Sequence, residues 1–171
     1  GSIIEQSWPS GLAIAAAVLA ELPPEATLFV GSSNSARDVD LAMSPSTRSA
    51  PLTVVASRGL AGIDGCVSTA IGLALAQPGR PAYALMGDLT FLHDSNVLLI
   101  GPQEPQPDLT IVVTNDDGGG IFTLLEPGEP SRATDFDRVF GTPTGAGFAD
   151  ICRAHGVPNH LAPTARDPRG A

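Results

Sequence analysis

Short apolar runs alternate with helix-like segments along the chain, and each run ends at a polar or glycine-rich stretch. Four runs predict strands, at residues 25–30, 52–56, 81–86 and 109–114. They lack the alternation of a half-exposed strand, which is typical of strands buried on both faces. Apolar segments between them predict helices at 11–22, 66–76 and 89–99. Ser10 is a suitable N-cap for the first helix, and Pro23 stops it.

This alternation of strands and helices predicts an α/β fold, a doubly wound parallel sheet with helices on both faces. The 171 residues are enough for one domain with a proper core. We expect a single domain over residues 1–171, with further short helices at 136–140 and 148–155. The end of the chain, 157–171, lacks a hydrophobic period and is expected to be poorly ordered or truncated.

Polar residues follow all four predicted strands. The first strand leads into Ser33 and Arg37, the second into Arg58, the third into Asp88, and the fourth into residues 115–120. The carboxyl ends of parallel strands share one edge of the sheet, and ligands collect there. We therefore expect these residues to belong to one site.

Asp88 and Asn115 end two neighbouring runs and offer the hard oxygen donors that Mg²⁺ prefers. One interpretation is a magnesium-bound diphosphate, with the backbone carbonyl of Asp117 as a third donor. Amides at the helix starts after Gly65 and Asp88 would then meet phosphate oxygens, and glycines 118–120 would let the backbone approach a ligand. The alternative is a helix-capping Asp88 and a turn-forming Asn115. Spacing alone leaves the two interpretations level.

The net charge of −9, with 18 acidic against 9 basic residues, argues against a nucleic-acid partner. Every basic residue is arginine, which excludes a Walker-type phosphate loop and any lysine chemistry in this chain. An anionic ligand would need local cations, and Arg37 and Arg58 suit a substrate that carries carboxylates. Either arginine taken alone would more simply be a surface residue. Asp64 is unfavourable beside a diphosphate, so we expect it to cap the following helix or to orient an amide.

The two cysteines, Cys66 and Cys152, form no CxxC motif and have no zinc-like spacing with the three histidines. They are expected to be buried small residues in a reducing compartment, which points to the cytoplasm. No apolar run approaches the length of a membrane span.

Two segments carry a resemblance. GDLTF at 87–91, followed after 27 positions by NDDGGG at 115–120, is similar to the thiamine-diphosphate motif. SRGLAGIDGCVSTAIGLAL at 57–75 and NDDGGGIFTLLEP at 115–127 resemble, more narrowly, the MenD family of menaquinone-pathway synthases. The resemblance covers roughly residues 10–155 and implies the C-terminal, diphosphate-binding domain of a larger subunit.

The resemblance implies a carboligase that uses thiamine diphosphate with Mg²⁺ or Mn²⁺. It would decarboxylate 2-oxoglutarate and add the succinic semialdehyde unit to isochorismate, in a cytoplasmic homo-oligomer, a dimer or tetramer. No catalytic residue would lie in this chain, because the activating glutamate belongs to a missing domain. Two other outcomes remain: another enzyme of this cofactor, such as one like acetohydroxyacid synthase, or a non-catalytic module.

The resemblance also implies roles for individual residues. The cation would be bound by Asp88, Asn115 and the carbonyl of Asp117. The residues that would contact the cofactor are Ile63, Gly87, Asp88, Leu89 and Asn115. The residues that would bind substrate are Ser33, Arg37, Arg58, Ile121 and Phe122. Relatives often carry Asn where Asp116 or Asp117 stands, so this chain places extra negative charge near the metal.

Overall fold

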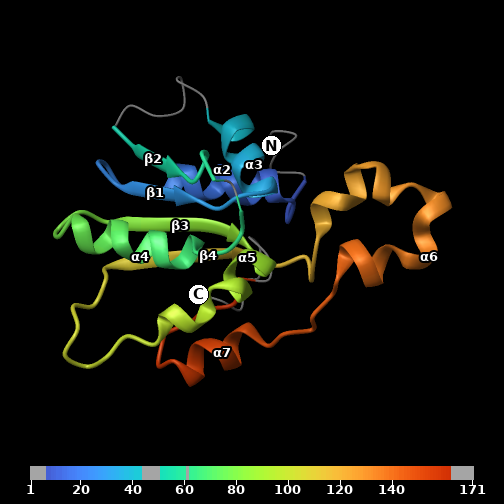
Figure 1. Ribbon diagram of the computed structural model, residues 1–171. Coiled ribbons are helices and arrows are strands. Elements are labelled where there is room, and N and C mark those ends of the chain that lie inside the picture. Colours follow the sequence, from blue (N-terminus) through green and yellow to red (C-terminus); the bar gives the residue numbers. More distant parts are fainter. Residues whose placement is uncertain (1–6, 44–50, 61, 163–171) are drawn as a thin grey trace.

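A four-stranded parallel sheet with the order β2-β1-β3-β4 forms the centre of the molecule (Figure 1). The structure, a computed structural model, describes residues 7–43, 51–60 and 62–162. The strands are β1 (Thr27–Val30), β2 (Thr53–Ala56), β3 (Ala82–Gly87) and β4 (Leu109–Thr114). All four predicted strands and their parallel pairing are confirmed.

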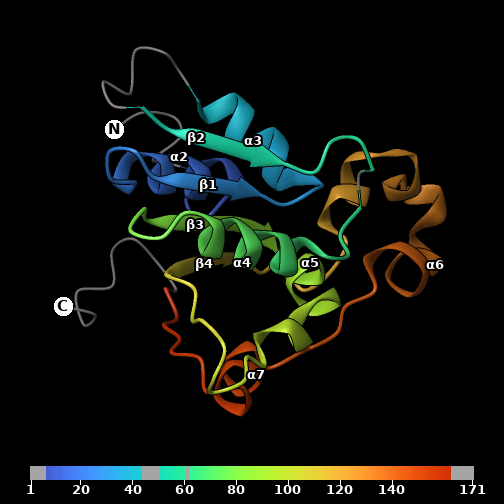
Figure 2. The ribbon, with the colours of Figure 1, turned by 60° about the vertical axis from the view of Figure 1, so that its left-hand side comes forward.

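Helices cover both faces of the sheet, as the doubly wound prediction requires (Figures 1 and 2). One face packs on α2 (Gly11–Glu21) and α3 (Asn34–Ala42). The other packs on α4 (Cys66–Ala76), α5 (Asp88–His93), the short 3₁₀ helix η1 (Ser95–Leu98) and α7 (Phe148–Ala154). Within the three described ranges, no helix combines the length and apolar character that a membrane crossing needs.

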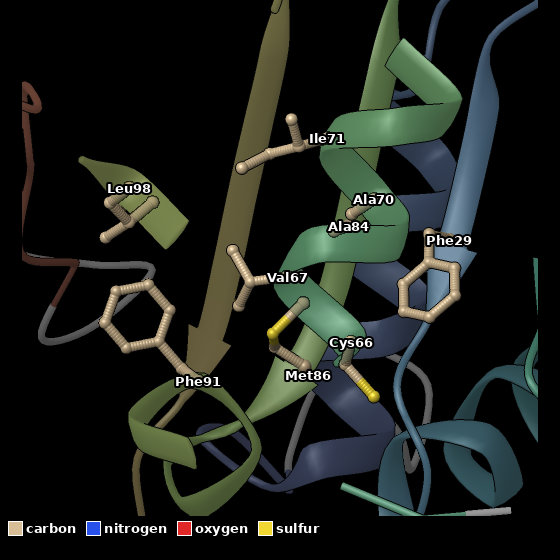
Figure 3. Packing of buried hydrophobic residues seen from close by; sticks show 9 residues of the cluster. All are labelled: Phe29, Cys66, Val67, Ala70, Ile71, Ala84, Met86, Phe91 and Leu98. Atoms are coloured by element: carbon tan, nitrogen blue, oxygen red, sulfur yellow. The ribbon is translucent and has the colours of Figure 1, made fainter. Parts of the chain in front are cut away.

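The core between α4 and the sheet follows from the spacing of buried residues on that helix. Val67, Ala70 and Ile71 recur at helical intervals and therefore form one apolar stripe. Figure 3 shows this stripe above Ala84 and Met86 of β3, with Phe29 of β1 beside it. The burial of every residue of β1 and of most of β3 explains why their sequences show no polar alternation. The edge strands β2 and β4 are only half-buried, so the expectation of burial on both faces is wrong for these two.

Two helices differ from those that the sequence predicts. No helix is predicted at 34–42, but these residues form α3, which buries only Ser35 and Val39. The predicted helix at 89–99 is interrupted after His93. At the break, Asp94 accepts hydrogen bonds from both the amide and the hydroxyl of Ser68, at 2.6 and 3.0 Å. From here the backbone bonds run from residue i to residue i−3, from the amide of Asp94 to the carbonyl of Phe91 and from the amide of Val97 to the carbonyl of Asp94, both at 3.3 Å, so the chain continues as the 3₁₀ helix η1.

Residues 120–141 form a chain of short helical turns that projects from the sheet, and we call it the excursion (Figures 1 and 2). Its elements are η2 (Gly120–Leu124), η3 (Glu126–Gly128), η4 (Pro130–Arg132), α6 (Ala133–Phe136) and the π-helical η5 (Asp137–Gly141). The predicted helix at 136–140 therefore lies across α6 and η5, and that at 148–155 corresponds to α7. Residues 163–171 of the predicted poorly ordered end lie outside the described residues.

At the opposite edge of the sheet, Arg80 joins segments that are distant in sequence. Its guanidinium donates to the backbone carbonyl of Glu25, to Gln77 Oε1 at 3.5 Å and to Thr53 Oγ1 at 3.4 Å. Gln77 Oε1 also accepts from Thr27 Oγ1 at 2.9 Å. One arginine thus links the starts of β1 and β2 to the turn that follows α4.

Replacing Arg80 with alanine should lower the free energy of unfolding by about 1–2 kcal/mol, because a cationic donor is lost to a backbone carbonyl. Urea denaturation of the purified chain measures this loss. Arg153→Ala, on an exposed arginine paired with Asp150, is the matched control and should change stability by less than about 0.5 kcal/mol. Equal stability of the two variants would contradict the linking role of Arg80.

Candidate functional site

The register of β3 and β4 brings two predicted site residues together. Gly87 pairs with Thr114 in this parallel ladder, so the next residues, Asp88 and Asn115, leave the sheet side by side. The sheet order places β1 on the other side of β3. The chain therefore changes winding direction between β1 and β3, and ligands bind at such a switch point in open α/β sheets.

Asp88 is the first residue of α5, and only 2% of its surface is exposed. Its Oδ2 accepts a hydrogen bond of 2.7 Å from the backbone amide of Gly118. The N-cap of α5 is Gly87, and the carboxylate of Asp88 bonds to Gly118 outside the helix, so the interpretation of Asp88 as the helix cap is wrong. The carboxylate instead ties the end of β3 to the loop that follows β4.

Asn115 forms the turn that the alternative interpretation predicted. Its Oδ1 accepts from the amide of Asp117 at 3.0 Å, which is an Asx turn. An amide oxygen has two lone pairs, so this bond leaves capacity for a cation. The turn-forming and metal-binding interpretations of Asn115 are therefore compatible.

The glycines after Asp117 are explained by chain packing. A Cβ on Gly118 would collide with the carbonyl of Gly141, and one on Gly119 would collide with the carbonyl of Phe140. Gly118 also has φ +141°, which disfavours other residues. The expectation that these two glycines clear space for a ligand is thus corrected, because the end of the excursion fills that space.

Negative charge gathers beside this loop. Partial burial, followed by repulsion from Asp88 and Asp117, raises the pKa of Asp116. Among the described residues, no three His, Cys, Asp or Glu side chains gather as metal ligands. The two strand ends instead present the carboxylate of Asp88, the side-chain amide of Asn115 and backbone carbonyls. This donor chemistry fits a hard divalent ion, which would relieve the repulsion that Asp116 experiences.

The two predicted arginines also come together. Arg37 on α3 and Arg58 after β2 are exposed and line one cavity of about 490 Å³, together with Asp40. Arg37 Nη1 donates to the backbone carbonyl of Ser33 at 2.9 Å, where the backbone has φ 76° and ψ −139°. Sequence reasoning missed Asp40, because its presence in the cavity depends on the unexpected helix α3.

The remaining predicted residues are half-buried around the same edge. Leu89 lies in α5, Ile63 precedes α4, and Ile121 and Phe122 lie in η2. The ring of Phe122 packs on that of Phe140, with centroids 5.5 Å apart. None of these four lines the arginine cavity, and neither does Asp88 or Asn115. The structure thus forms two groups, one over β1 and β2 and one over β3 and β4.

The backbone amides at the start of α4 were expected to be free to donate to phosphate oxygens, and the structure differs. The N-cap of α4 is Gly65, without a side-chain capping bond, so Asp64 does not cap the helix. Asp94 takes that role, because it accepts from the amide of Ser68 in the first turn. That amide is therefore bonded to a carboxylate of the chain itself rather than offered to a phosphate.

The cysteines serve as small side chains of the packing. Cys66 is buried and Cys152 is half-buried, and both are free thiols. Burial is the main cause that raises the pKa of each thiol, and the charges of Asp94 and Asp64 raise that of Cys66 further. A thiol with a raised pKa stays protonated and is a poor nucleophile.

A profile of the family described as thiamine pyrophosphate enzyme, C-terminal TPP binding domain, matches residues 40–169. The chain is similar to proteins named 2-succinyl-5-enolpyruvyl-6-hydroxy-3-cyclohexene-1-carboxylate synthase. It is 57% identical to one from Saccharopolyspora erythraea over 152 residues, which are 89% of this chain and 27% of that protein. It is 55% identical to one from Nocardia farcinica over 152 residues, 88% of this chain and 27% of that protein. The chain thus spans about a quarter of these relatives, and the resemblance to the MenD family is confirmed.

In cation-free protein, Asp116→Asn should raise Tm at neutral pH. The raised folded-state pKa means that ionising Asp116 costs stability, and the cost is present above that pKa and absent below the unfolded value of about 3.9. We expect a gain of about one or two degrees at pH 7, because solvent screens the group. The gain should fade toward pH 3. Thermal unfolding with a chelator from pH 3 to 8 measures it, and a gain independent of pH would contradict the repulsion.

Proposed function

This chain belongs to the thiamine pyrophosphate enzymes, through their C-terminal TPP binding domain, and from this premise we propose that it forms the diphosphate-binding part of a 2-succinyl-5-enolpyruvyl-6-hydroxy-3-cyclohexene-1-carboxylate synthase. Residues 1–171 would be one domain of a longer subunit. The activating glutamate would lie on another domain. The share of the relatives that the chain spans, 27%, supports this division.

The juxtaposition of Asp88 and Asn115 at paired strand ends is the observation that supports the cofactor site most directly. We propose that these side chains and the backbone carbonyl of Asp117 hold Mg²⁺ or Mn²⁺. Gly87 and Leu89 flank the carboxylate and would contact the cofactor, as would Ile63 ahead of α4. When bound, thiamine diphosphate would supply the chemistry that breaks and forms the carbon–carbon bonds.

The arginine cavity supports an acceptor that carries carboxylates. Arg37 and Arg58 present two planar cations against the single carboxylate of Asp40, so the cavity attracts anions within an acidic chain. We propose that these arginines and Ser33 bind isochorismate, and that Ile121 and Phe122 contact the apolar part of a substrate. The donor would be 2-oxoglutarate, whose decarboxylation leaves the succinic semialdehyde unit.

We also propose a cytoplasmic homo-oligomer, a dimer or tetramer. The free thiols of Cys66 and Cys152 suit a reducing compartment. A partner subunit that supplies the glutamate would complete a site of which this chain holds only the diphosphate half.

Replacing Asp88 with alanine in an enzyme that also has the pyrimidine-binding domain should weaken Mg²⁺-dependent cofactor binding by at least about 100-fold, because a charged ligand is lost. Calorimetric titration measures this affinity. Asp88→Asn keeps an oxygen that accepts from Gly118 and serves as the control for folding. It should bind cofactor weakly while retaining the secondary structure. Unchanged affinity in a folded Asp88→Asn enzyme would contradict the metal assignment.

Replacing Arg58 with alanine should raise the KM for isochorismate by about 10- to 100-fold, because a charged hydrogen-bond partner is lost. Release of CO₂ from 2-oxoglutarate should stay near its original rate. Steady-state kinetics with isochorismate and a separate decarboxylation assay measure the two effects, and Arg153→Ala on α7 is the control.

Equal losses in both assays would contradict a carboxylate-binding role for Arg58. Turnover of pyruvate in preference to 2-oxoglutarate and isochorismate would favour an enzyme like acetohydroxyacid synthase instead. Cofactor binding without turnover of any of these substrates, in an enzyme with both domains, would favour a non-catalytic module.

A further inference from the structure

We propose that the carboxylate of Asp117 is a positioning group that holds the loop carrying Asn115 to residues 144 and 145, which follow the excursion. These bonds would then fix the position of the cation site relative to Ile121 and Phe122, the residues proposed to line the substrate. The consequence for cation binding rests on the proposed function, whereas the fastening is a property of the chain alone.

The fastening consists of two hydrogen bonds to one oxygen. Asp117 Oδ1 accepts from the backbone amides of Thr144 at 3.1 Å and Gly145 at 2.9 Å, which lie 27 and 28 residues later. Bonds to an ionised acceptor are stronger than those between neutral groups. They hold Asp117 in the left-handed region, at φ 56°, which is uncommon for a residue with a side chain.

A further backbone hydrogen bond lies beside the two bonds of Asp117. The amide of Gly119 donates to the carbonyl of Gly141 at 2.7 Å, and there is no room for a side chain on Gly118 or Gly119 at this contact. Hydrogen bonds therefore join residues 117 and 119, just before the excursion, to its last residue and to residues 144 and 145 after it. We call this set of contacts the base of the excursion. Inside it, the rings of Phe122 and Phe140 pack together, so Phe122 is tied to the last turn before the base.

The same loop is bonded to the carboxylate proposed to bind the cation. Gly118, the neighbour of Asp117, donates its amide to Asp88 Oδ2. A continuous path of bonds thus runs from Asp88 through Gly118 and Asp117 to Thr144. The two amides hold the carboxylate of Asp117 toward residues 144 and 145, which leaves its backbone carbonyl as the donor that we propose for the cation.

Three substitutions of Asp117 separate the possible causes. Asn keeps the accepting oxygen, tolerates the left-handed region and removes only the charge. Ala removes the acceptor, and Gly removes the acceptor while relieving the backbone cost. Asp116→Ala is the matched control for losing one carboxylate from the same loop without touching the fastening.

Amide hydrogen exchange in cation-free protein tests the fastening itself. We expect Asp117→Ala and Asp117→Gly to accelerate exchange at Thr144 and Gly145, and across residues 120–141, by about tenfold or more. Asp117→Asn and Asp116→Ala should stay within about threefold of the original protein. Rescue of slow exchange by Asp117→Gly would assign the effect to backbone conformation and overturn the proposal, as would unchanged exchange in Asp117→Ala.

Binding of Mn²⁺, followed by electron paramagnetic resonance in the enzyme with both domains, tests the coupling to the cation site. Asp117→Ala should raise the Kd for Mn²⁺ by about tenfold relative to Asp117→Asn, although both variants lose the same charge. Equal affinities of these two variants would overturn the coupling. If Asp88→Asn also bound Mn²⁺ normally, the proposed function would fail separately, while the exchange result would still decide the fastening.

Discussion

The hydrogen bond from the amide of Gly118 to the buried carboxylate of Asp88 holds the candidate site together. A carboxylate that is only 2% exposed is costly unless a donor meets it, and this donor comes from the loop after the neighbouring strand. The loop reaches Asp88 because Gly87 and Thr114 are paired in register. A shift of one residue would turn the side chains of β4 to the opposite face and separate the two strand ends.

The sequence was sufficient to predict the parallel sheet and to predict that Asp88 and Asn115 follow neighbouring strand ends. Buried parallel strands are apolar throughout, and residues that follow them share an edge whatever their distance in sequence. The same reasoning brought Arg37 and Arg58 to one cavity. It missed α3, because the run from Asn34 to Asp38 is polar and the helix buries only a narrow stripe.

Contacts between segments without regular spacing could not be predicted from the sequence, for a physical reason. Neither the bonds of Asp117 to residues 144 and 145 nor those of Asp94 to Ser68 follow from any periodicity, because they join segments without regular spacing. Glycine is equally ambiguous, since close approach of a ligand and close approach of the chain demand the same missing side chain. At Gly118 only coordinates distinguish the two, and the chain itself approaches there.

The edge of the sheet is divided electrostatically, and this division bears on what it binds. Carboxylates cluster over β3 and β4, where repulsion from Asp88 and Asp117 helps to raise the pKa of Asp116. Arginines gather over β1 and β2. A divalent cation on the acidic half would offset most of its negative charge and give a diphosphate a cation to bind within a chain of net charge −9. In the function that we propose, the acidic half would bind the diphosphate and the basic half a carboxylate substrate, and the switch point between β1 and β3 separates the two halves.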